Sequence, residues 1–189
     1  MLRNELKVAI RFTVLTTVLL GILYPLAVTA FGHFFLRSQA DGELIVTNGQ
    51  VSGSPLIGQN FTGDQYFHGR PSAAGNGYDA TSSGGSNLAS SSQKLVTRID
   101  GDIKNYAAEN KSQPVPIDLV TASGSGLDPD ISPAAAMFQA ASVAGARHLP
   151  LATVHDLVQR HIQGRQFGFL GEERVNVLLL NMDLDRLAH

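Results

Sequence analysis

The amino-acid sequence predicts an α+β domain attached to a single N-terminal transmembrane helix. An uncharged run of twenty residues, 12–31, lies near the start of the chain. Beyond residue 37, short strand patterns and helical patterns follow one another in mixed order, which is typical of an α+β domain. We expect a cytoplasmic N-terminus at residues 1–11, a transmembrane helix at 12–36 and an external domain at 37–189.

The uncharged run is long enough to cross a bilayer core of roughly 30 Å. Lipid offers no hydrogen bonds to the backbone, so this run is expected to be helical despite Gly21 and Pro25. A buried helix of a soluble domain and a cleaved signal peptide are the alternatives, and residues 28–30 loosely resemble a cleavage site. The apolar sequence continues through residues 34–36, which favours an uncleaved anchor because signal cores are shorter.

Basic residues are unevenly distributed around this helix. Arg3, Lys7 and Arg11 precede it, whereas Arg37 is the only strong base directly after it. Basic flanks stay in the cytoplasm, so the N-terminus is predicted inside and the domain outside. From residue 38 onward, ten Lys and Arg residues stand against fifteen Asp and Glu residues, which makes the external domain mildly acidic.

Small and polar residues recur on the predicted transmembrane helix. Thr13, Thr16, Thr17 and Gly21 follow near-helical spacing, with Pro25 one turn further on. Small residues let a neighbouring helix approach closely. We therefore expect Gly21 and Pro25 to belong to a face that packs against a partner helix.

Composition excludes several classes of function. The chain has no Cys and therefore no thiol nucleophile, disulfide or cysteine metal site. Its net charge is −2, it has no Trp, and its bases form no stripe, so nucleic acid is not an expected partner. His155 and His161 are six residues apart and would lie on different helix faces, so no metal site is predicted. No catalytic residue is predicted either, since Ser123 and Ser125 have no recognisable base nearby in sequence.

The external domain begins with a hairpin signal. Asn48-Gly49 lies between short apolar runs, and both positions of a type I′ turn need a positive φ. Residues 68–92 are rich in Gly, Ser, Asn and Pro, a composition typical of a flexible linker. Aromatic residues such as Phe67 and Tyr78 are unusual in disordered linkers, so an ordered loop that presents backbone N–H groups is an equal alternative.

Four further elements are expected. Apolar spacing from Leu88 to Tyr106 predicts a helix that Ser86 or Asn87 caps. Alternation at residues 115–119 predicts a strand with Pro116 at its edge.

A second helix is expected at residues 153–162, where Thr153 would cap and Asp156 would complete a capping box. Gly164 is expected to end this helix. The apolar run at residues 175–181 predicts a short strand that is buried on both faces.

The stretch TASGSGLDPDISPAAA, residues 121–136, invites three interpretations. Asp128, Asp130 and Ser132 imitate the start of a calcium loop, but Pro133 and Gln139 stand where such a loop needs Gly and Glu. A phosphate loop would need Gly-Lys, and the chain contains none. The third interpretation is the entry into a helix.

Ser132 is a good N-cap, and Pro133 suits the first helical position because it lacks an N–H. The Ser and Gly residues at 123–126 exceed what a helix start requires. Glycines permit close approach of a backbone, so these residues either lead into the helix only or also form a contact surface for a ligand or a partner chain.

Long motifs in this chain resemble one known family, the C subunit of the bacterial Kdp potassium-transporting P-type ATPase. The resemblance covers nearly the whole chain and rests on the basic N-terminus with its single apolar span and on GSPLIGQNF (53–61), YFHGRPSAAGNGYDATSSGGSN (66–87), VPIDLVTASGSGLDPDISPAAA (115–136) and LGEERVNVLLLNMDLD (170–185). Asp130 departs from the family, which often carries His there, and the LASSSQ that follows Asn87 is variable.

The resemblance implies a bacterial inner-membrane complex with a potassium-channel-like subunit, a P-type ATPase subunit and a small single-span subunit. ATP and potassium would be handled by that complex, and this chain would bind no cofactor of its own. The C subunit is expected to assist assembly and stability, to couple the channel-like and ATPase subunits, or to raise nucleotide affinity. The last role conflicts with a periplasmic domain, because ATP is cytoplasmic.

Two of these segments, rich in Gly and Ser, are candidate contact surfaces. The residues expected to touch a partner or ligand are Gly84, Gly85, Ser86, Asn87, Ser123, Gly124, Ser125, Gly126 and Asp128. The alternative function is that of a membrane-anchored extracytoplasmic binding protein that acts alone.

Overall fold

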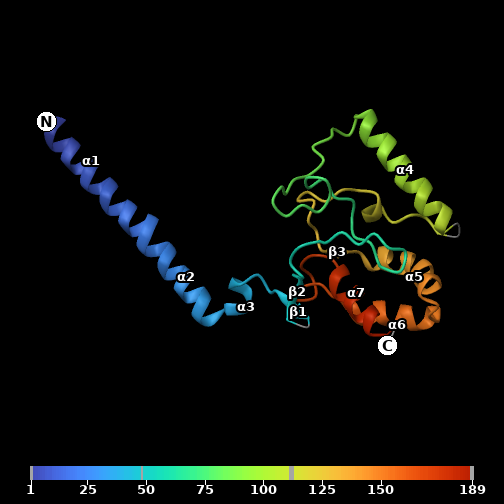
Figure 1. The fold of residues 1–189 in the computed structure, drawn as a ribbon. Helices are drawn as coiled ribbons and strands as arrows, with labels where there is room; N and C mark the ends of the chain where they lie inside the picture. The colour runs from blue at the N-terminus through green and yellow to red at the C-terminus, as the bar shows by residue number, and fades with distance from the viewer. Residues whose placement is uncertain (1, 48, 111–112, 188–189) are drawn as a thin grey trace. The chain divides into compact units, whose positions relative to one another are not determined.

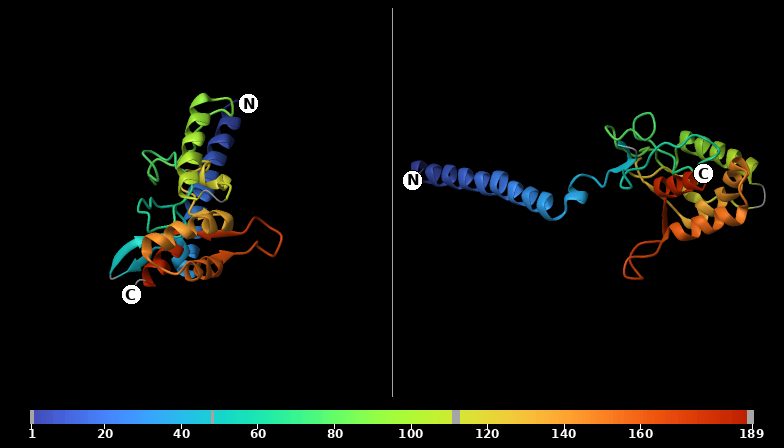
Figure 2. Two further views of the ribbon diagram at one scale, coloured as in Figure 1. Left: turned by 90° about the vertical axis from the view of Figure 1, so that its right-hand side faces the viewer. Right: turned by 60° about the horizontal axis from the view of Figure 1, so that its bottom comes forward.

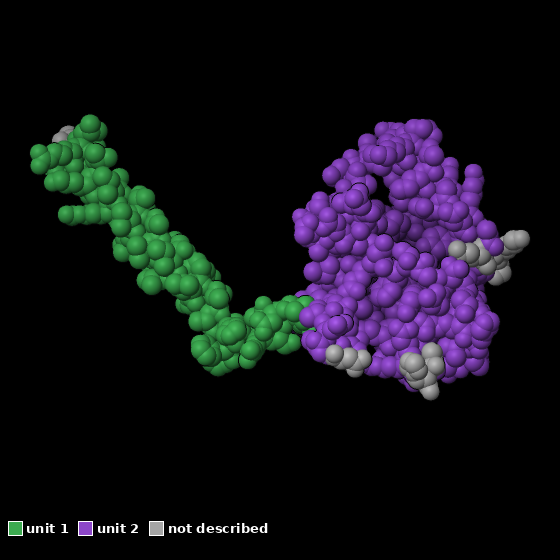
Figure 3. Space-filling model, viewed as in Figure 1, with its two compact units in different colours: residues 1–44 green, residues 45–189 purple. Residues whose placement is uncertain are grey.

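A computed structural model describes residues 2–47, 49–110 and 113–187 (Figure 1). The chain divides into two compact units, residues 1–44 and residues 45–189 (Figure 3). The first unit is helical and the second mixes helices with short strands, which confirms the predicted α+β domain on a single N-terminal helix. The boundary lies at residue 44, a few residues after the long helix ends.

The N-terminal unit contains one long helix that is apolar enough to cross a membrane. Its parts are α1 (Leu2–Thr16), the π-helix η1 (Thr17–Leu23) and α2 (Tyr24–Phe35). The most apolar window has a mean hydropathy of 2.1, and none of it is buried against protein. A short helix, α3 (Arg37–Ala40), follows.

Pro25 explains the π-helical turn. Proline has no N–H, and its ring collides with the carbonyl four residues earlier, which here belongs to Gly21. Directly before Pro25, the N–H of Tyr24 donates to the carbonyl of Leu19, five residues back. This wider turn separates the ring from the carbonyls before it without ending the helix.

The domain opens with the predicted hairpin. Strands β1 (Ile45–Thr47) and β2 (Gln50–Gly53) pair antiparallel, with Thr47 opposite Gln50. Gly49 has a φ of +78°, as a tight turn demands. Asn48, the other predicted turn residue, lies outside the described residues, so the turn type remains a prediction.

The Gly- and Ser-rich stretch that follows the hairpin is an ordered loop. Residues 54–92, all of which the structure describes, form neither helix nor strand. Phe67 and Ala74 are nevertheless fully buried within the domain. Of the two alternatives for this stretch, the ordered loop is correct and the flexible linker is not, because its aromatic and small residues are part of the core.

Two predictions for the next segment need correction. Helix α4 (Gln93–Glu109) begins after Ser92, so Leu88, Ser86 and Asn87 lie in the preceding loop. The predicted strand at 115–119 is instead a 3-10 turn, η2 (Ile117–Leu119). Pro116 accepts a hydrogen bond from the N–H of Leu119 at 3.2 Å, and three alternating residues are too few to outweigh this local turn.

The remaining elements form a small sheet covered by helices. Strand β3 (Asp130–Ile131), helix α5 (Pro133–Arg147), helix α6 (Leu151–His161), strands β4 (Ile162–Gln163) and β5 (Arg174–Asn176), and helix α7 (Val177–Arg186) follow in that order. The sheet is antiparallel with the order β3-β5-β4. At the start of α5, the Ser132 side chain accepts a hydrogen bond from the N–H of Ala135 at 3.0 Å, so the predicted cap is confirmed.

The predicted N-cap of α6 is wrong by three residues. Pro150 occupies the N-cap position, so Thr153 lies in the first turn and makes no capping box with Asp156. Pro150 already has the extended backbone conformation of an N-cap residue, because its ring fixes φ at about −65°. The helix therefore begins before Thr153, whose hydroxyl does not cap it. The apolar face is as predicted, since Val154 and Leu157 are buried. The helix ends at His161, and β4 separates it from Gly164.

The strand predicted at 175–181 is correct only for residues 175 and 176. Strand β5 ends at Asn176, whose side chain accepts from the N–H of Leu179 at 3.1 Å and caps α7. Val177, Leu180 and Leu184 are buried at helical spacing. A short apolar run fits a strand or a buried helix equally, and the cap decides for the helix.

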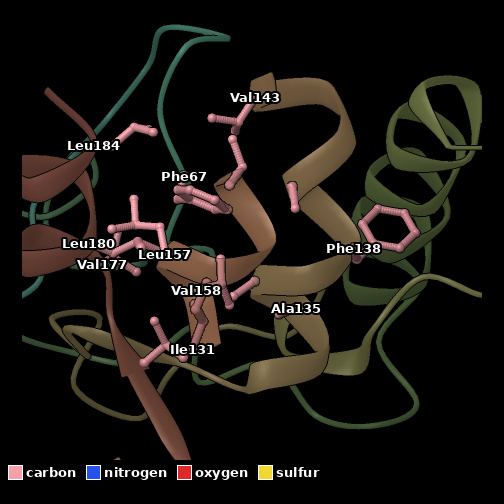
Figure 4. Close-up of a cluster of buried hydrophobic side chains, with 14 of the residues drawn as sticks. Phe67, Ile131, Ala135, Phe138, Val143, Leu157, Val158, Val177, Leu180 and Leu184 are labelled. Carbon is pink, nitrogen blue, oxygen red and sulfur yellow. The ribbon is translucent and has the colours of Figure 1, made fainter. Parts of the chain in front are cut away.

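The core lies between α5, α6 and α7 (Figure 4). Phe67 from the long loop points into it and lies among Val143, Leu157 and Leu180 (Figure 4). The loop therefore completes the core of the domain, which fixes the position of the segments that follow Phe67.

Candidate functional site

The two glycine-rich segments singled out in the sequence lie side by side. The N–H of Gly84 donates to the carbonyl of Ser125 at 2.8 Å, and the Ser83 hydroxyl donates to the same carbonyl at 3.0 Å. The Ser72 hydroxyl donates to the carbonyl of Gly126 at 2.5 Å. Residues 72–87 and 123–128 thus lie against each other, and we name the two segments together the glycine seam.

Gly126 is required by a close approach inside the chain. It has a φ of +69°, and a Cβ at this position would lie 2.7 Å from both the Ala74 nitrogen and the Gly84 oxygen. A Cβ on Gly85 would lie 3.0 Å from the Gly124 oxygen. For these two glycines the segment that approaches closely is another part of the same domain.

The middle of the seam is open to solvent. Gly124 and Ser125 are exposed, and a Cβ on Gly124 would meet no atom within 4 Å. The Ser125 hydroxyl accepts from the N–H of Leu127 at 3.1 Å, whereas Ser123 is buried. Gly124 and Ser125 are therefore the residues of this segment that a partner would reach.

The other predicted contact residues, 84–87, belong to the long loop, whose Gly84 is bonded to Ser125. Gly84 and Ser86 are half-buried, and Asn87 is exposed with a φ of +50°. A Cβ on Gly84 would meet nothing within 4 Å. The structure therefore brings the two predicted segments together but buries Ser123 and Gly126, and contact of the others with a partner stays a prediction.

Asp128 holds the long loop to this segment. Its carboxylate pairs with the Arg70 guanidinium at 3.1 Å and accepts from the N–H of Asp130 at 3.1 Å. The Arg70 Nε also donates to the carbonyl of Thr121 at 3.4 Å. The carboxylate is thus satisfied within the domain and positions the seam.

Tyr78 lies under the same ion pair. Burial chiefly, with the charges of Tyr106 and Asp128, raises the pKa of Tyr78 to about 12, although Arg70 acts in the opposite direction. Its hydroxyl donates to the carbonyl of Arg70 at 2.5 Å. The neutral phenol is the form that the fold requires.

Beside the seam lies a shallow depression of about 310 Å³ with mostly acidic walls, which we name the acidic depression. Its lining residues are Arg70, Asp118, Asp128, Asp130, Ile131, Ser132, Glu172, Glu173 and Arg174. Five carboxylates face two guanidiniums there. Burial raises the pKa of Asp130, while a hydrogen bond from Asn176 at 3.1 Å and the charge of Arg174 at 3.0 Å oppose the shift.

The described residues contain no group of three or more His, Asp or Glu side chains that could hold a metal ion. The Asp118 carboxylate accepts from the N–H of Ser132 at 2.7 Å, so it supports the start of α5. His161 lies 3.0 Å from Asp183, away from His155. Asp118, Asp128 and Asp130 are thus engaged within the domain, whereas Glu172 and Glu173 are exposed.

Sequence reasoning missed two amides that position the long loop. Asn181 accepts from the N–H of Phe67 and donates to its carbonyl, each at 2.9 Å. Gln139 does the same for His68, at 2.8 Å and 3.1 Å. Both are buried on the core faces of their helices, and a lone amide on such a face was the available signal.

Comparison with the sequences of known proteins covers nearly the whole chain. A family model described as K+-transporting ATPase, c chain (KdpC), matches residues 6–186. The potassium-transporting ATPase KdpC subunit of Acidobacterium capsulatum is 55% identical over 97% of this chain and 99% of its own. Those of Koribacter versatilis and Mycobacterium tuberculosis are 51% and 48% identical, over 97% and 98% of this chain and 95% and 100% of theirs.

Proposed function

The chain belongs to the KdpC family, the c chains of K+-transporting ATPases, and on this premise we propose that it is an accessory, non-catalytic subunit of an ATP-driven potassium uptake complex. The observation that carries the proposal is the extent of the family match, which includes both the long apolar helix and the domain. The relatives named as subunits of such an ATPase therefore share both parts. The chain would act together with a potassium-channel-like subunit, a P-type ATPase subunit and a small single-span subunit.

The long helix would anchor the chain in the bacterial inner membrane and pack against partner helices. The basic residues at positions 3, 7 and 11 support a cytoplasmic N-terminus and a periplasmic domain. In that orientation the domain would dock over the external face of the channel-like subunit. Its excess of acids would modestly concentrate cations there, within about 8 Å at physiological salt.

The internal hydrogen bonds of the seam support a binding role over a chemical one. The Ser125 hydroxyl and the Asp128 carboxylate are engaged with neighbouring groups of the domain, which holds the exposed surface rigid. Such a surface would hold the channel-like and ATPase subunits together and couple them. An effect on nucleotide affinity would then be exerted through the anchor helix and the partner subunits.

Purification of the tagged chain from its native membrane in mild detergent tests the proposal. We expect the channel-like, ATPase and small subunits to co-purify, and potassium-stimulated ATPase activity to depend on the presence of this chain. Recovery of the chain by itself, with full ATPase activity in its absence, would instead favour a membrane-anchored binding protein that acts alone.

A further inference from the structure

The loop between β4 and β5 presents three large apolar side chains to solvent. Phe167 is 87% exposed, Phe169 71% and Leu170 47%. In Figure 2 this orange-red loop projects from the body of the domain in both views. We name these three residues the apolar finger.

The finger is held in one conformation. Gln166 and Leu170 exchange two backbone hydrogen bonds of 2.9 Å, and the N–H of Gly168 donates to the carbonyl of Arg165 at 3.1 Å. Phe167 has a φ of +54°, which is uncommon for a side chain of this size. A strained phenylalanine held outward is typical of a functional constraint, since the domain itself gains nothing from its exposure.

The charges beside the finger distinguish between possible occupants. Arg165 precedes the finger, whereas Glu172 and Glu173 follow it and line the acidic depression, where five carboxylates outnumber two guanidiniums, so the border as a whole is acidic. A bilayer surface that carries anionic lipids would repel this border. A protein surface with Lys or Arg side chains would be attracted to it and oriented by it.

We propose that the apolar finger inserts into an apolar socket, bordered by basic side chains, on another subunit of the transport complex. Rigid aromatic anchors in such sockets supply most of the energy of many protein interfaces. The basic side chains around the socket would pair with the carboxylates of the acidic depression. These ion pairs would fix the orientation of the domain on its partner. This inference rests on the proposed function, because it assumes that the chain works within a complex.

Site-specific photo-crosslinking in the assembled membrane tests the inference. The photoreactive analogue p-benzoylphenylalanine replaces Phe169 in the tagged full-length chain, and Val96, which is 42% exposed on α4 and lines no part of the acidic depression, is the control position. We expect a covalent adduct between position 169 and another subunit of the complex, and at least tenfold less from position 96. An adduct with phospholipid, an adduct with a second copy of this chain, or no adduct above the control would each overturn the proposal.

A second measurement separates this inference from the function on which it rests. Phe167→Ser with Phe169→Ser should lower recovery of the other subunits about tenfold, whereas Val96→Ser should not. The thermal unfolding of the purified full-length variants should stay close to that of the wild type, because these side chains are largely exposed. If the wild-type chain retains its partners and the finger variant retains them equally, the finger proposal is wrong while the proposed function stands.

Discussion

Asn181 binds the backbone of Phe67 from 114 residues away, with its amide accepting from the N–H and donating to the carbonyl, each at 2.9 Å. The Asn181 amide thus makes the two backbone hydrogen bonds to Phe67 that a neighbouring strand would make in a sheet. Phe67 can therefore be buried although its segment forms neither helix nor strand. The seam that follows Phe67 in the chain depends on this connection for its position.

Asn181→Ala should lower the free energy of unfolding by about 3 kcal/mol, since each buried backbone group left without a partner costs about 1–3 kcal/mol. Denaturant unfolding of the full-length chain in detergent measures the loss. Asn105→Ala on the exposed surface of α4 is the matched control and should change stability little. Equal stability of the two variants would contradict the role assigned to Asn181.

Substitutions in the seam should separate folding from partner contact. Gly126→Val should destabilise the domain by at least about 2 kcal/mol, because a branched side chain there would be strained and would collide with Ala74 and Gly84. Gly124→Val meets no neighbour, so it should leave stability unchanged and reduce recovery of the partner subunits. Thermal unfolding and co-purification are measured for both.

Ser132→Ala provides the reference for that comparison. It removes the cap of α5 and should cost about 1 kcal/mol without a specific effect on assembly. If Gly124→Val also affects assembly no more than its stability explains, the exposed part of the seam makes no partner contact.

The phenol of Tyr78 should titrate near pH 12. Because its folded pKa is raised above 10.0, the fold favours the neutral phenol, so its contribution to stability is present below pH 10 and is lost between pH 10 and 12. Tyrosinate absorbance of the wild type and of Tyr78→Phe measures this. The variant should lack an absorbance step near pH 12 that the wild type shows, and an unchanged step in the variant would contradict its assignment to Tyr78.

Gly21→Leu should weaken assembly without preventing membrane insertion. A leucine there would obstruct the face that Thr17 and Gly21 share, where small side chains permit close helix approach. Gly32→Leu, on the same long helix, is the control and should retain the partners. Membrane fractionation and co-purification are compared. Full recovery of partners with Gly21→Leu would leave the domain as the sole site of attachment.

Protease added to spheroplasts should digest the domain beyond Arg37 while the N-terminus stays protected. The three bases that precede the apolar run are the physical reason for this orientation. A domain that resists digestion until the membrane is opened would reverse the topology and would make a direct contact with ATP credible.

The sequence predicted those elements whose signals are local. The helix cap at Ser132, the hairpin strands around residue 49 and the buried face of α6 depend on neighbouring residues, and all three are confirmed. The apolar run at residues 175–181 is compatible with a strand and with a buried helix. Only the cap formed by Asn176 shows where the strand ends and the helix begins. A period of two and a period of 3.6 cannot be told apart in so short an apolar run.

The site depends on contacts that no local pattern contains. Residues 123–126 were expected to approach something closely, but the partner of Gly126 in that approach, residues 74 and 84 of the same chain, lies about forty to fifty positions away. The ion pair of Arg70 with Asp128 and the amide of Gln139 are similarly distant in sequence. Their pairing is decided by the packing of the long loop onto the core.

The π-helical turn before Pro25 changes the direction in which the long helix presents its side chains. A π turn takes in one residue more than an α turn, and one residue corresponds to a rotation of about 100°. Side chains after Tyr24 therefore lie on a different side of the helix from the face that Thr13 and Thr17 form. A straight neighbouring helix can follow one half of this helix or the other, so the two halves are suited to separate neighbours.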